Sequence, residues 1–337
     1  MKVLIADKFP DQYVQKLIDH DIEVIYQPKL GENDLPEAAK EVDILVVRST
    51  KVNEETINNS KQLNLIIRAG AGVNNINIAA ANKKGIYVSN CPGKNSIAVA
   101  ELAIGLMIAL DRRIPDNVKD FNNGKWNKGE YSKAEGLFGK TLAIVGYGNI
   151  GKEVATRALA LGLNVYVKDI SRIEGYGIKD FSEFDQTLPK ADIISIHLPA
   201  TPETKGLFDD KMFSYMKDGA ILINTSRQDV INEEALIKAV KEKNIRVGLD
   251  VFKGEPEGKD GEVKSALQGL ENVYVTHHIG ASTQQAQNAV AEETIKIILD
   301  FIHSGVIAHW VNRAKVTDAH FQLVVKHYDK PGVLASI

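Results

Sequence analysis

Residues 141–151 read Thr-Leu-Ala-Ile-Val-Gly-Tyr-Gly-Asn-Ile-Gly, and this stretch decides the fold. The apolar run 141–145 has the composition of a buried strand, and three glycines follow it, Gly146, Gly148 and Gly151. In this spacing the first glycine permits a tight turn, the second lets the backbone approach a pyrophosphate, and the third lets a new helix pack closely on the strand. The pattern therefore predicts a strand, a phosphate-binding turn and a helix whose N-terminal N–H groups face an anion.

An acidic residue further along the chain supports this interpretation. Asp169 ends the next apolar run and is placed to hydrogen-bond the 2′-hydroxyl of a ribose. Three glycines alone are weak evidence, because such spacings arise by chance in loops. The agreement of strand, helix and distal acid favours a dinucleotide site that includes Asn149 and Ile150 over a structural turn. It predicts NAD as the cofactor, since a carboxylate repels the 2′-phosphate of NADP.

Short apolar runs alternate with helical patterns along most of the chain. Continuous apolar strands separated by helices imply parallel sheets covered on both faces. The 337 residues are also enough for two domains. The sequence thus predicts an α/β fold with two doubly wound parallel sheets. The expected strands are 3–6, 24–26, 44–47, 65–67 and 86–88 in the first domain, and 142–145, 165–167, 193–196, 221–223, 247–249 and 273–276 in the second.

The composition points to a small ligand. Lys and Arg number 41 and Asp and Glu 44, and no basic block is interleaved with aromatic residues, so nothing favours a nucleic acid or membrane partner. The single cysteine, Cys91, excludes an intrachain disulfide and a thiolate metal cluster, and no metal site is expected. The longest apolar stretch, 97–110, is shorter than a bilayer span and carries Glu101. Because the N-terminus lacks a signal-peptide pattern, we expect a cytoplasmic enzyme.

Chemistry-bearing residues follow the expected strands of the second domain. Ligands bind outside the carboxyl ends of the strands in an open parallel sheet. Arg227, Asp250, Glu255 and the pair 277–278, both histidines, lie at or just after such ends. Oxidation of a secondary alcohol by hydride transfer needs a base, a cation for the substrate carboxylate and an acid that orients the base. Each residue alone also fits a surface ion pair, a solvated loop or a strand end, but their joint placement favours the catalytic interpretation.

At this point the sequence resembles the D-2-hydroxyacid dehydrogenases over nearly its whole length, and within them most closely the branch that acts on 3-phosphoglycerate. The resemblance rests on an ordered set of motifs. These are 68–75 (Arg-Ala-Gly-Ala-Gly-Val-Asn-Asn), the turn at Gly146, 224–227 (Asn-Thr-Ser-Arg), 249–252 (Leu-Asp-Val-Phe), 255–256 (Glu-Pro) and 278–283 (His-Ile-Gly-Ala-Ser-Thr).

The resemblance implies a role for each matched position. Arg227 binds the substrate carboxylate and carbonyl, His278 donates or accepts the proton, and Glu255 pairs with His278. Residues 70–73 grip the substrate carboxylate, with Gly70, Gly72 and Val73 as substrate contacts. The further cofactor contacts implied are Ala71, Leu198, Thr225, Ser226, Asp250, Gly280 and Ala281.

The resemblance also implies the domain organisation. A flavodoxin-like substrate-binding domain comprises 1–94 and 284–312, completed by a long helix expected over 282–303, and a Rossmann NAD-binding domain comprises 95–283. Residues 318–337 look like the opening of an ACT-type regulatory module, too short to bury a core and so expected to be poorly ordered or paired with another chain. A homodimer through the NAD-binding domain is also expected.

The substrate is the main open question at this stage. Arg48 and Arg68 end neighbouring strands and resemble phosphate-handling positions, and two arginines there can make bidentate contacts to phosphate. The expected reaction is NAD-dependent oxidation of 3-phosphoglycerate to 3-phosphohydroxypyruvate, the first step of serine biosynthesis. Pairing of both arginines with local carboxylates is the alternative for these residues. Reduction of hydroxypyruvate or glyoxylate is the alternative within the family, and an NAD-responsive, corepressor-like binding protein is the alternative outside enzymes.

One further expectation concerns the two adjacent histidines. Neighbouring residues on an extended strand face opposite sides, so only one of His277 and His278 can readily face the substrate. The family motif selects His278.

Overall fold

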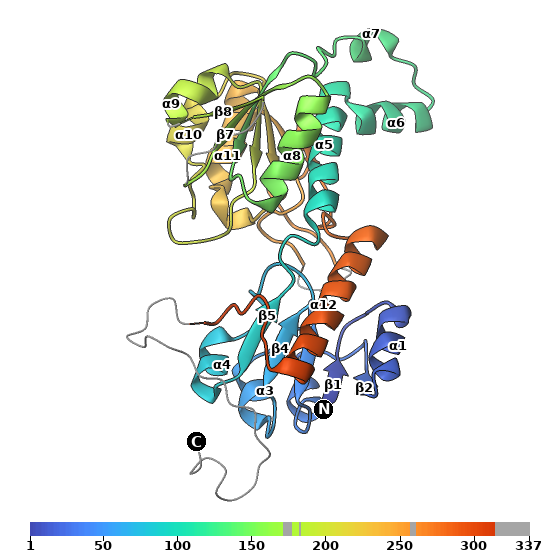
Figure 1. Ribbon diagram of the computed structural model, residues 1–337. Coiled ribbons are helices and arrows are strands. Elements are labelled where there is room, and N and C mark those ends of the chain that lie inside the picture. Colours follow the sequence, from blue (N-terminus) through green and yellow to red (C-terminus); the bar gives the residue numbers. More distant parts are fainter. Residues whose placement is uncertain (171–176, 182, 257–260, 314–337) are drawn as a thin grey trace, which may run out of the picture. The chain divides into compact units, whose positions relative to one another are not determined.

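The computed structural model describes residues 1–170, 177–181, 183–256 and 261–313 (Figure 1). The chain forms two compact units. One is built from Met1–Asn95 and the segment that begins at Gln284, and the other from Ser96–Thr283. The expected ACT-like segment, 318–337, lies outside the described residues.

The first unit contains a five-stranded sheet in the order β2-β1-β3-β4-β5, in which every pairing is parallel. This is the flavodoxin-like order, as expected, and it reverses between β1 and β3. The strands are β1 (Lys2–Ile5), β2 (Glu23–Tyr26), β3 (Ile44–Val47), β4 (Leu65–Arg68) and β5 (Tyr87–Asn90), and the helices are α1 (Asp11–Asp19), α2 (Leu35–Ala38), α3 (Glu54–Asn59), α4 (Ile78–Lys84) and α12 (Gln284–Ser304).

Both faces of this sheet are covered, because alternate residues of each strand point to opposite sides. Val3 and Ile5 belong to a buried cluster that includes Leu17 of α1 and Ile298 of α12. The residue between them, Leu4, belongs to a second cluster with residues of α2, α3 and α4. A helix from the far end of the chain therefore completes the core of a sheet whose strands all come from the first 95 residues.

The second unit contains a seven-stranded parallel sheet in the order β12-β11-β10-β9-β6-β7-β8. This is the Rossmann strand order with one additional strand, and it reverses between β6 and β9. The strands are β6 (Thr141–Val145), β7 (Asn164–Lys168), β8 (Ile178–Asp180), β9 (Ile193–Ile196), β10 (Ile221–Asn224), β11 (Arg246–Leu249) and β12 (Val273–Val275). The α-helices are α5 (Ser96–Arg112), α6 (Ile114–Asn122), α7 (Lys128–Tyr131), α8 (Asn149–Ala160), α9 (Phe184–Thr187), α10 (Asp210–Tyr215) and α11 (Glu233–Lys243), and 3-10 turns span Leu188–Lys190 and Gln228–Val230.

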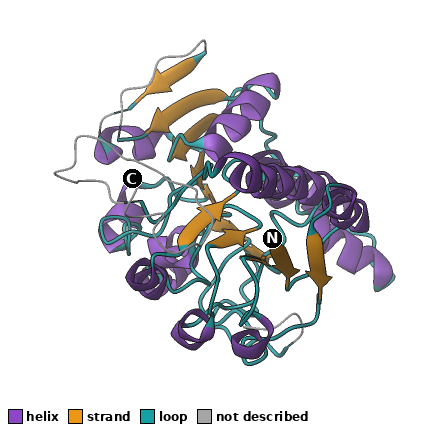
Figure 2. Cartoon of the chain, turned by 60° about the horizontal axis from the view of Figure 1, so that its bottom comes forward, coloured by secondary structure: helices purple, strands orange, loops and turns teal. Residues whose placement is uncertain are grey.

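Two buried clusters again lie on opposite faces of the sheet. One joins α5 and α8 to residues such as Ile144 and Ile223, and the other joins α10 and α11 to Val145 and Leu222. Figure 2 colours these helices purple and the strands orange. No helix among the described residues is both long and apolar enough to cross a membrane.

Candidate active site

The glycine turn after β6 has the conformation that its sequence predicts. Gly146 has φ 96°, and a Cβ atom there would lie 2.5 Å from the carbonyl oxygen of His197. A Cβ atom on Gly151 would lie 2.1 Å from the carbonyl oxygen of Gly146. Both positions therefore require glycine. Around Gly148, by contrast, the space that a side chain would occupy is open.

The residues around this turn fit a dinucleotide. Helix α8 begins at Asn149 with no side-chain cap and no acidic residue in its first turn, so its first N–H groups are left for an anion such as a pyrophosphate. Asp169 follows β7, and its Oδ2 accepts a hydrogen bond of 2.6 Å from the N–H of Tyr147, which ties the expected ribose-binding carboxylate to the turn. The Oγ1 atom of Thr225 is buried without a hydrogen-bond partner among the described residues, so it is available to form a hydrogen bond with a ligand.

Asn224 builds the turn that carries Arg227. This buried asparagine ends β10, and its Oδ1 accepts hydrogen bonds from the backbone N–H (3.0 Å) and the Oγ (2.7 Å) of Ser226. Its Nδ2 donates to the carbonyl oxygen of Arg227 at 2.9 Å. One guanidinium nitrogen of Arg227 donates to the carbonyl oxygen of Ser226 at 2.6 Å. The side chain of Arg227 is thus held close to its own turn, and its other guanidinium N–H groups are available to a ligand.

Asp250 fixes the loop that carries the candidate base. The residue is 2% exposed, and its Oδ1 accepts hydrogen bonds from Thr276 Oγ1 (2.6 Å) and from the N–H of Ile279 (2.8 Å). Its Oδ2 accepts from the N–H of Gly280 at 2.7 Å, and a Cβ atom on Gly280 would lie only 2.9 Å from that oxygen. Every hydrogen bond observed for this carboxylate holds the loop, so a contact of Asp250 with the nicotinamide remains a prediction.

His278 and Glu255 form a close pair. Nδ1 of His278 lies 2.7 Å from Oε2 of Glu255, whose Oε1 accepts a hydrogen bond of 2.8 Å from the N–H of Phe252. The hydrogen bond to Glu255 raises the pKa of His278 above its ordinary value. Burial and the nearby charge of Arg227 act in the opposite direction but do not cancel this effect. The imidazole is therefore oriented and its charged form is stabilised, as acid–base chemistry requires.

The expectation that His277 and His278 alternate along an extended strand is wrong. Strand β12 ends at Val275, and His278 has φ 52°, so the two histidines do not alternate along an extended strand. Such a left-handed conformation is uncommon for residues other than glycine, and it is often found at functional sites. The loop anchored by Asp250, rather than strand alternation, brings His278 to Glu255.

The first unit carries its own cluster at the carboxyl ends of β3 and β4. A Cβ atom on Gly70, whose φ is 154°, would lie 1.7 Å from Nη1 of Arg68, so the guanidinium group lies over this glycine. Ala71, the residue after Gly70, is held by a hydrogen bond of 2.5 Å that Nδ2 of Asn90 donates to its carbonyl oxygen. The guanidinium group of Arg48 makes no hydrogen bond or ion pair with any described residue. Gly72 and Val73 are half-buried in the same loop, and Val73 packs against the core.

The remaining expected contacts lie near the glycine turn or in the histidine loop. Leu198 approaches Gly146, because a Cβ atom on that glycine would lie 3.1 Å from Cδ2 of the leucine. Ala281 directly follows Gly280 and is half-buried. No group of three or more His, Cys, Asp or Glu side chains suited to a metal ion occurs among the described residues.

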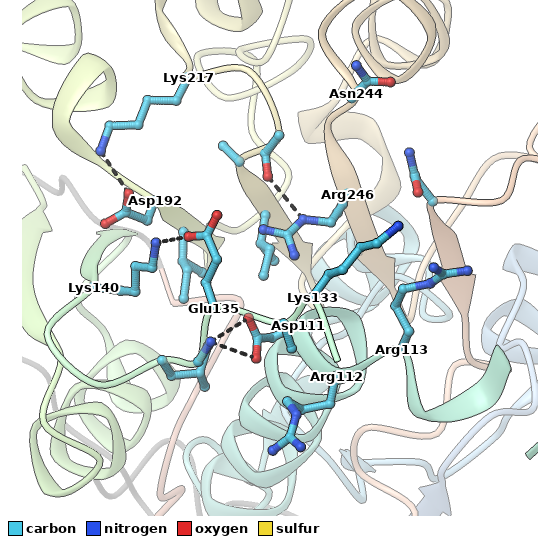
Figure 3. Close-up of a pocket in the computed structure, with 18 of the residues that line it drawn as sticks. Asp111, Arg112, Arg113, Lys133, Glu135, Lys140, Asp192, Lys217, Asn244 and Arg246 are labelled. Carbon is cyan, nitrogen blue, oxygen red and sulfur yellow. Dashed lines mark hydrogen bonds and ion pairs between the residues drawn. The ribbon is translucent and has the colours of Figure 1, made fainter. Parts of the chain in front are cut away.

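A cavity of about 540 Å³ lies away from these residues (Figure 3). It opens at the amino ends of β9, β10 and β11, the opposite edge of the sheet from His278, and none of the expected site residues lines it. Several of its cations are already paired with acids, for example Lys217 with Asp192 at 2.8 Å. The cavity therefore does not compete with the carboxyl edge as the candidate active site.

Comparison with known proteins identifies the family. Residues 104–280 match the family model described as the D-isomer specific 2-hydroxyacid dehydrogenase, NAD binding domain. The chain is 40% identical to hydroxypyruvate reductase of Thermotoga maritima over 88% of this chain and 97% of that protein. It is 36% identical to D-3-phosphoglycerate dehydrogenase of Archaeoglobus fulgidus, matching along its whole length but spanning only 64% of that protein. The structure of NAD⁺-bound 3-phosphoglycerate dehydrogenase of Entamoeba histolytica has a TM-score of 0.78 and 29% identity, covering 93% of this chain and 99% of that one.

The chain therefore belongs to the D-isomer specific 2-hydroxyacid dehydrogenase family. It is an NAD-dependent dehydrogenase of a small hydroxy acid.

Sequence reasoning missed several residues that shape the candidate site. Asn224 and Thr276 organise the turns that carry Arg227 and His278, and Asp7 organises the loop that carries Arg48. One signal was visible for two of them, because Asp7 and Asn224 are polar residues at the ends of apolar runs expected to be buried strands. Their partners could not be found from sequence, because the contacts depend on how strands and loops lie beside one another.

Proposed function

We propose that this enzyme oxidises 3-phosphoglycerate to 3-phosphohydroxypyruvate with NAD, the first step of serine biosynthesis. The reaction removes a hydride from C2 of the substrate and a proton from its hydroxyl group. NAD, when bound, accepts the hydride. The protein must remove the proton, hold the substrate and keep C2 in position.

The 2.7 Å contact between His278 and Glu255 is the main observation that supports oxidation of an alcohol with His278 as the base. In the oxidation, neutral His278 accepts the hydroxyl proton at its free Nε2, while Glu255 holds Nδ1 and stabilises the imidazolium that forms. Arg227 supplies the positive charge for the carboxylate and the developing carbonyl oxygen. Asp250 and Asn224 act indirectly, because they hold the two loops that carry these side chains.

The cofactor roles follow from the same arrangement. We assign the pyrophosphate to the turn Gly146, Gly148 and Gly151 and to the N-terminus of α8, including Asn149 and Ile150. Asp169 hydrogen-bonds the adenosine ribose. The nicotinamide end is assigned to Thr225, Ser226, Asp250, Gly280 and Ala281, with Ala71 and Leu198 as further contacts.

Preference for a phosphorylated substrate is supported by Arg48 and Arg68. Arg48 follows β3 and Arg68 ends the neighbouring β4, and the guanidinium group of Arg48 is not used by any described residue. The substrate carboxylate is assigned to the loop of Gly70, Gly72 and Val73. Similarity to the Archaeoglobus fulgidus phosphoglycerate dehydrogenase agrees with this choice. A hydroxypyruvate reductase is the second candidate, favoured by the 40% identity to the Thermotoga maritima enzyme and by the nearly complete coverage of that protein.

A substrate panel tests the two candidates. NADH formation is measured with 3-phosphoglycerate and D-glycerate, which differ only in the phosphate, and NADH consumption with hydroxypyruvate and glyoxylate. We expect kcat/KM for 3-phosphoglycerate to exceed that for D-glycerate by about 10-fold or more, because the phosphate adds charge-assisted contacts. Equal values for the two hydroxy acids, together with rapid reduction of hydroxypyruvate, would assign the reductase function instead.

We propose further that the enzyme is a homodimer through its NAD-binding unit. The segment 113–138 exposes three large aromatic side chains, Phe121 (71% exposed), Trp126 (84%) and Phe138 (87%). Three large aromatic side chains this exposed within one short segment are what an interface with another protein would cover. The occupant we propose is a second copy of this chain, as the family resemblance implies.

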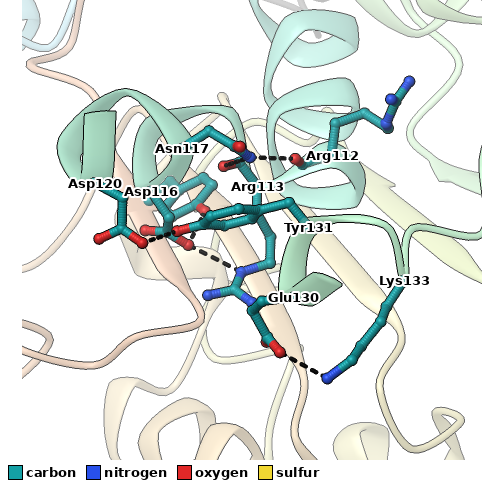
Figure 4. A network of polar contacts seen from close by, with 9 residues as sticks. Arg112, Arg113, Asp116, Asn117, Asp120, Glu130, Tyr131 and Lys133 are labelled. Atoms are coloured by element: carbon teal, nitrogen blue, oxygen red, sulfur yellow. Dashed lines mark hydrogen bonds and ion pairs between the residues drawn. The ribbon is translucent and has the colours of Figure 1, made fainter. Parts of the chain in front are cut away.

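The segment is held in place from within, which suits a preformed interface. Figure 4 shows Arg113 between Asp116 and Glu130, with N···O distances of 3.1 and 2.7 Å. Tyr131 donates a hydrogen bond to Asp120, and Tyr274 of β12 donates one of 2.8 Å to Asp116. Sedimentation should show a dimer that Trp126→Asp converts to monomer, while Ile18→Asp, at an exposed apolar position of the first unit, leaves it intact. A monomeric native protein would exclude this proposal.

A further inference from the structure

Asp7 is a buried carboxylate that binds a single loop. It lies just after β1 and is 8% exposed. Its Oδ2 accepts hydrogen bonds from the backbone N–H groups of Arg48 (2.6 Å), Ser49 (3.1 Å) and Thr50 (3.1 Å). Its Oδ1 accepts a fourth, of 3.0 Å, from the Oγ of Ser49. Burial opposes the charge, but the hydrogen bonds outweigh it and keep the pKa of Asp7 below its ordinary value.

This carboxylate occupies the point where the strand order of the first sheet reverses. Strands β1 and β3 are neighbours, with Ile5 opposite Val46. Continuing that register by two residues places Asp7 opposite Arg48. In open parallel sheets, ligands bind beyond the carboxyl ends of the strands at such a reversal. Asp7 therefore lies at the position in the first unit where a ligand is expected, although its own oxygens face the protein backbone.

The loop that Asp7 binds is fixed from a second side. Nδ2 of Asn75 donates a hydrogen bond of 2.8 Å to the carbonyl oxygen of Thr50. The N–H of Val52 donates to the carbonyl oxygen of Asn75 at 2.7 Å. The loop is thus held by its backbone at both ends, and the fold does not use the guanidinium group of Arg48.

The hydrogen bonds also explain why Asp7 does not form an ion pair with the guanidinium group of Arg48. A carboxylate offers about four acceptor positions. Four donors from residues 48–50 contact Asp7, three at Oδ2 and one at Oδ1, so most of its acceptor capacity is used by the backbone and by Ser49. An aspartate beside an arginine would otherwise form an ion pair with it and remove its charge from ligand binding. Here the arginine backbone is bound while its side chain stays available.

We propose that Asp7 is a positioning residue for substrate recognition: it holds the 48–50 loop so that Arg48 is presented to the anionic group of the substrate. The inference rests on the proposed function, because it takes Arg48 as a substrate contact. Asp7 itself does not touch the substrate.

Steady-state kinetics of Asp7→Ala and Asp7→Asn test the proposal. We expect Asp7→Ala to raise KM for 3-phosphoglycerate about 10-fold or more while kcat falls much less, since misplacing a binding group by about 1 Å is costly. Asp7→Asn keeps an acceptor oxygen of similar shape and should recover part of the loss. KM for NAD should not change, because the expected cofactor turn belongs to the other unit.

Asp43→Ala is the matched control. Asp43 also accepts a backbone hydrogen bond, 2.7 Å from the N–H of Lys2, but it precedes β3 at the opposite edge of the same sheet. Asp43→Ala should lower the melting temperature of the protein without raising KM for 3-phosphoglycerate. A merely structural role for Asp7 predicts the same behaviour for both alanine variants, and that result would overturn the proposal.

Hydrogen exchange of the amides of residues 48–50 separates this inference from the proposed function. These amides should exchange faster in Asp7→Ala than in the native protein, whichever substrate is used. If the native enzyme does not oxidise 3-phosphoglycerate, the proposed function fails, and KM for hydroxypyruvate then serves as the kinetic measurement. If it does oxidise 3-phosphoglycerate and Asp7→Ala leaves KM unchanged, the role of Asp7 is wrong and the function stands.

Discussion

Nδ1 of His278 lies 2.7 Å from Oε2 of Glu255, and the other oxygen of this glutamate is fixed by the N–H of Phe252. The carboxylate therefore sets the direction of the imidazole ring and leaves Nε2 available.

Replacing His278 should remove most of the activity. His278→Ala is expected to lower kcat by roughly 100-fold or more, the usual contribution of general acid–base catalysis. His277→Ala is the control, because the neighbouring side chain makes no observed contact with Glu255. Both variants should bind NAD with native affinity in a fluorescence titration. A crippled His277→Ala beside a nearly normal His278→Ala would reverse the assignment.

Removing the charge of Glu255 should shift the pH dependence of oxidation. The hydrogen bond to Glu255 raises the pKa of His278, so in the native enzyme the base is protonated up to a higher pH. Only neutral His278 can accept the substrate proton. In Glu255→Gln the pKa falls, and the acidic limb of the kcat/KM profile should move to lower pH while the maximum rate decreases. An acidic limb at its native position would contradict the role of Glu255.

Asp169 should set the preference for NAD over NADP. Its carboxylate is tied to the glycine turn through the N–H of Tyr147, so it lies where a ribose 2′-substituent is expected. Asp169→Ala should weaken NAD and improve NADP, narrowing the ratio of kcat/KM between the two cofactors. The comparison uses the same substrate at saturating concentration. A native enzyme that uses both cofactors equally well would show that Asp169 does not discriminate.

Arg48 should distinguish phosphorylated from unphosphorylated substrates. Losing a charge-assisted hydrogen bond costs about 1.5 to 3 kcal/mol, so Arg48→Ala and Arg68→Ala should each reduce kcat/KM for 3-phosphoglycerate by about 10-fold or more. D-Glycerate, which lacks the phosphate, is the control substrate and should be affected much less. Equal losses on both substrates would give the two arginines a structural role.

Two glycine substitutions should have opposite effects. In Gly280→Ala the new Cβ atom would lie 2.9 Å from Asp250 Oδ2, so the loop must shift, and kcat should fall about 10-fold as His278 is displaced. Gly105 lies on the exposed side of α5, and a Cβ atom there meets nothing within 4 Å. Gly105→Ala should raise stability by about 0.5 to 1 kcal/mol in a denaturation experiment and leave kcat unchanged. Native activity in Gly280→Ala would show that the loop tolerates the shift.

Much of the fold could be predicted because buried parallel strands have a strong signal. Runs such as Ile-Leu-Val-Val at Ile44–Val47 are apolar throughout, and the structure confirms every expected strand to within a few residues. β8 (Ile178–Asp180) was missed, because its three residues include only one apolar side chain and lie at the sheet edge. Local composition therefore identifies central strands better than edge strands.

The site could be predicted only as a set of residues. The chain positions of Arg227, Glu255 and His278 indicated a shared sheet edge, and the structure brings Glu255 and His278 together. The left-handed conformation of His278 could not be foreseen, because it follows from hydrogen bonds to Asp250, 28 positions earlier in the sequence than His278. The contact of Asp7 with the loop of Arg48 likewise depends on the register of β1 and β3, which are neighbours in the sheet although β2 lies between them in the sequence.

Helix α12 makes the order of synthesis matter for folding. When the ribosome has produced Met1–Asn95, all five strands of the first sheet exist, but the helix that covers Ile5 and its neighbours on one face does not. Helix α1 covers part of that face, but the part that α12 covers stays open until Gln284–Ser304 emerges after the whole second unit. The second unit is continuous in sequence and can fold first. The nascent chain can thus complete its dinucleotide-binding unit before the last element of its amino-terminal unit has been made.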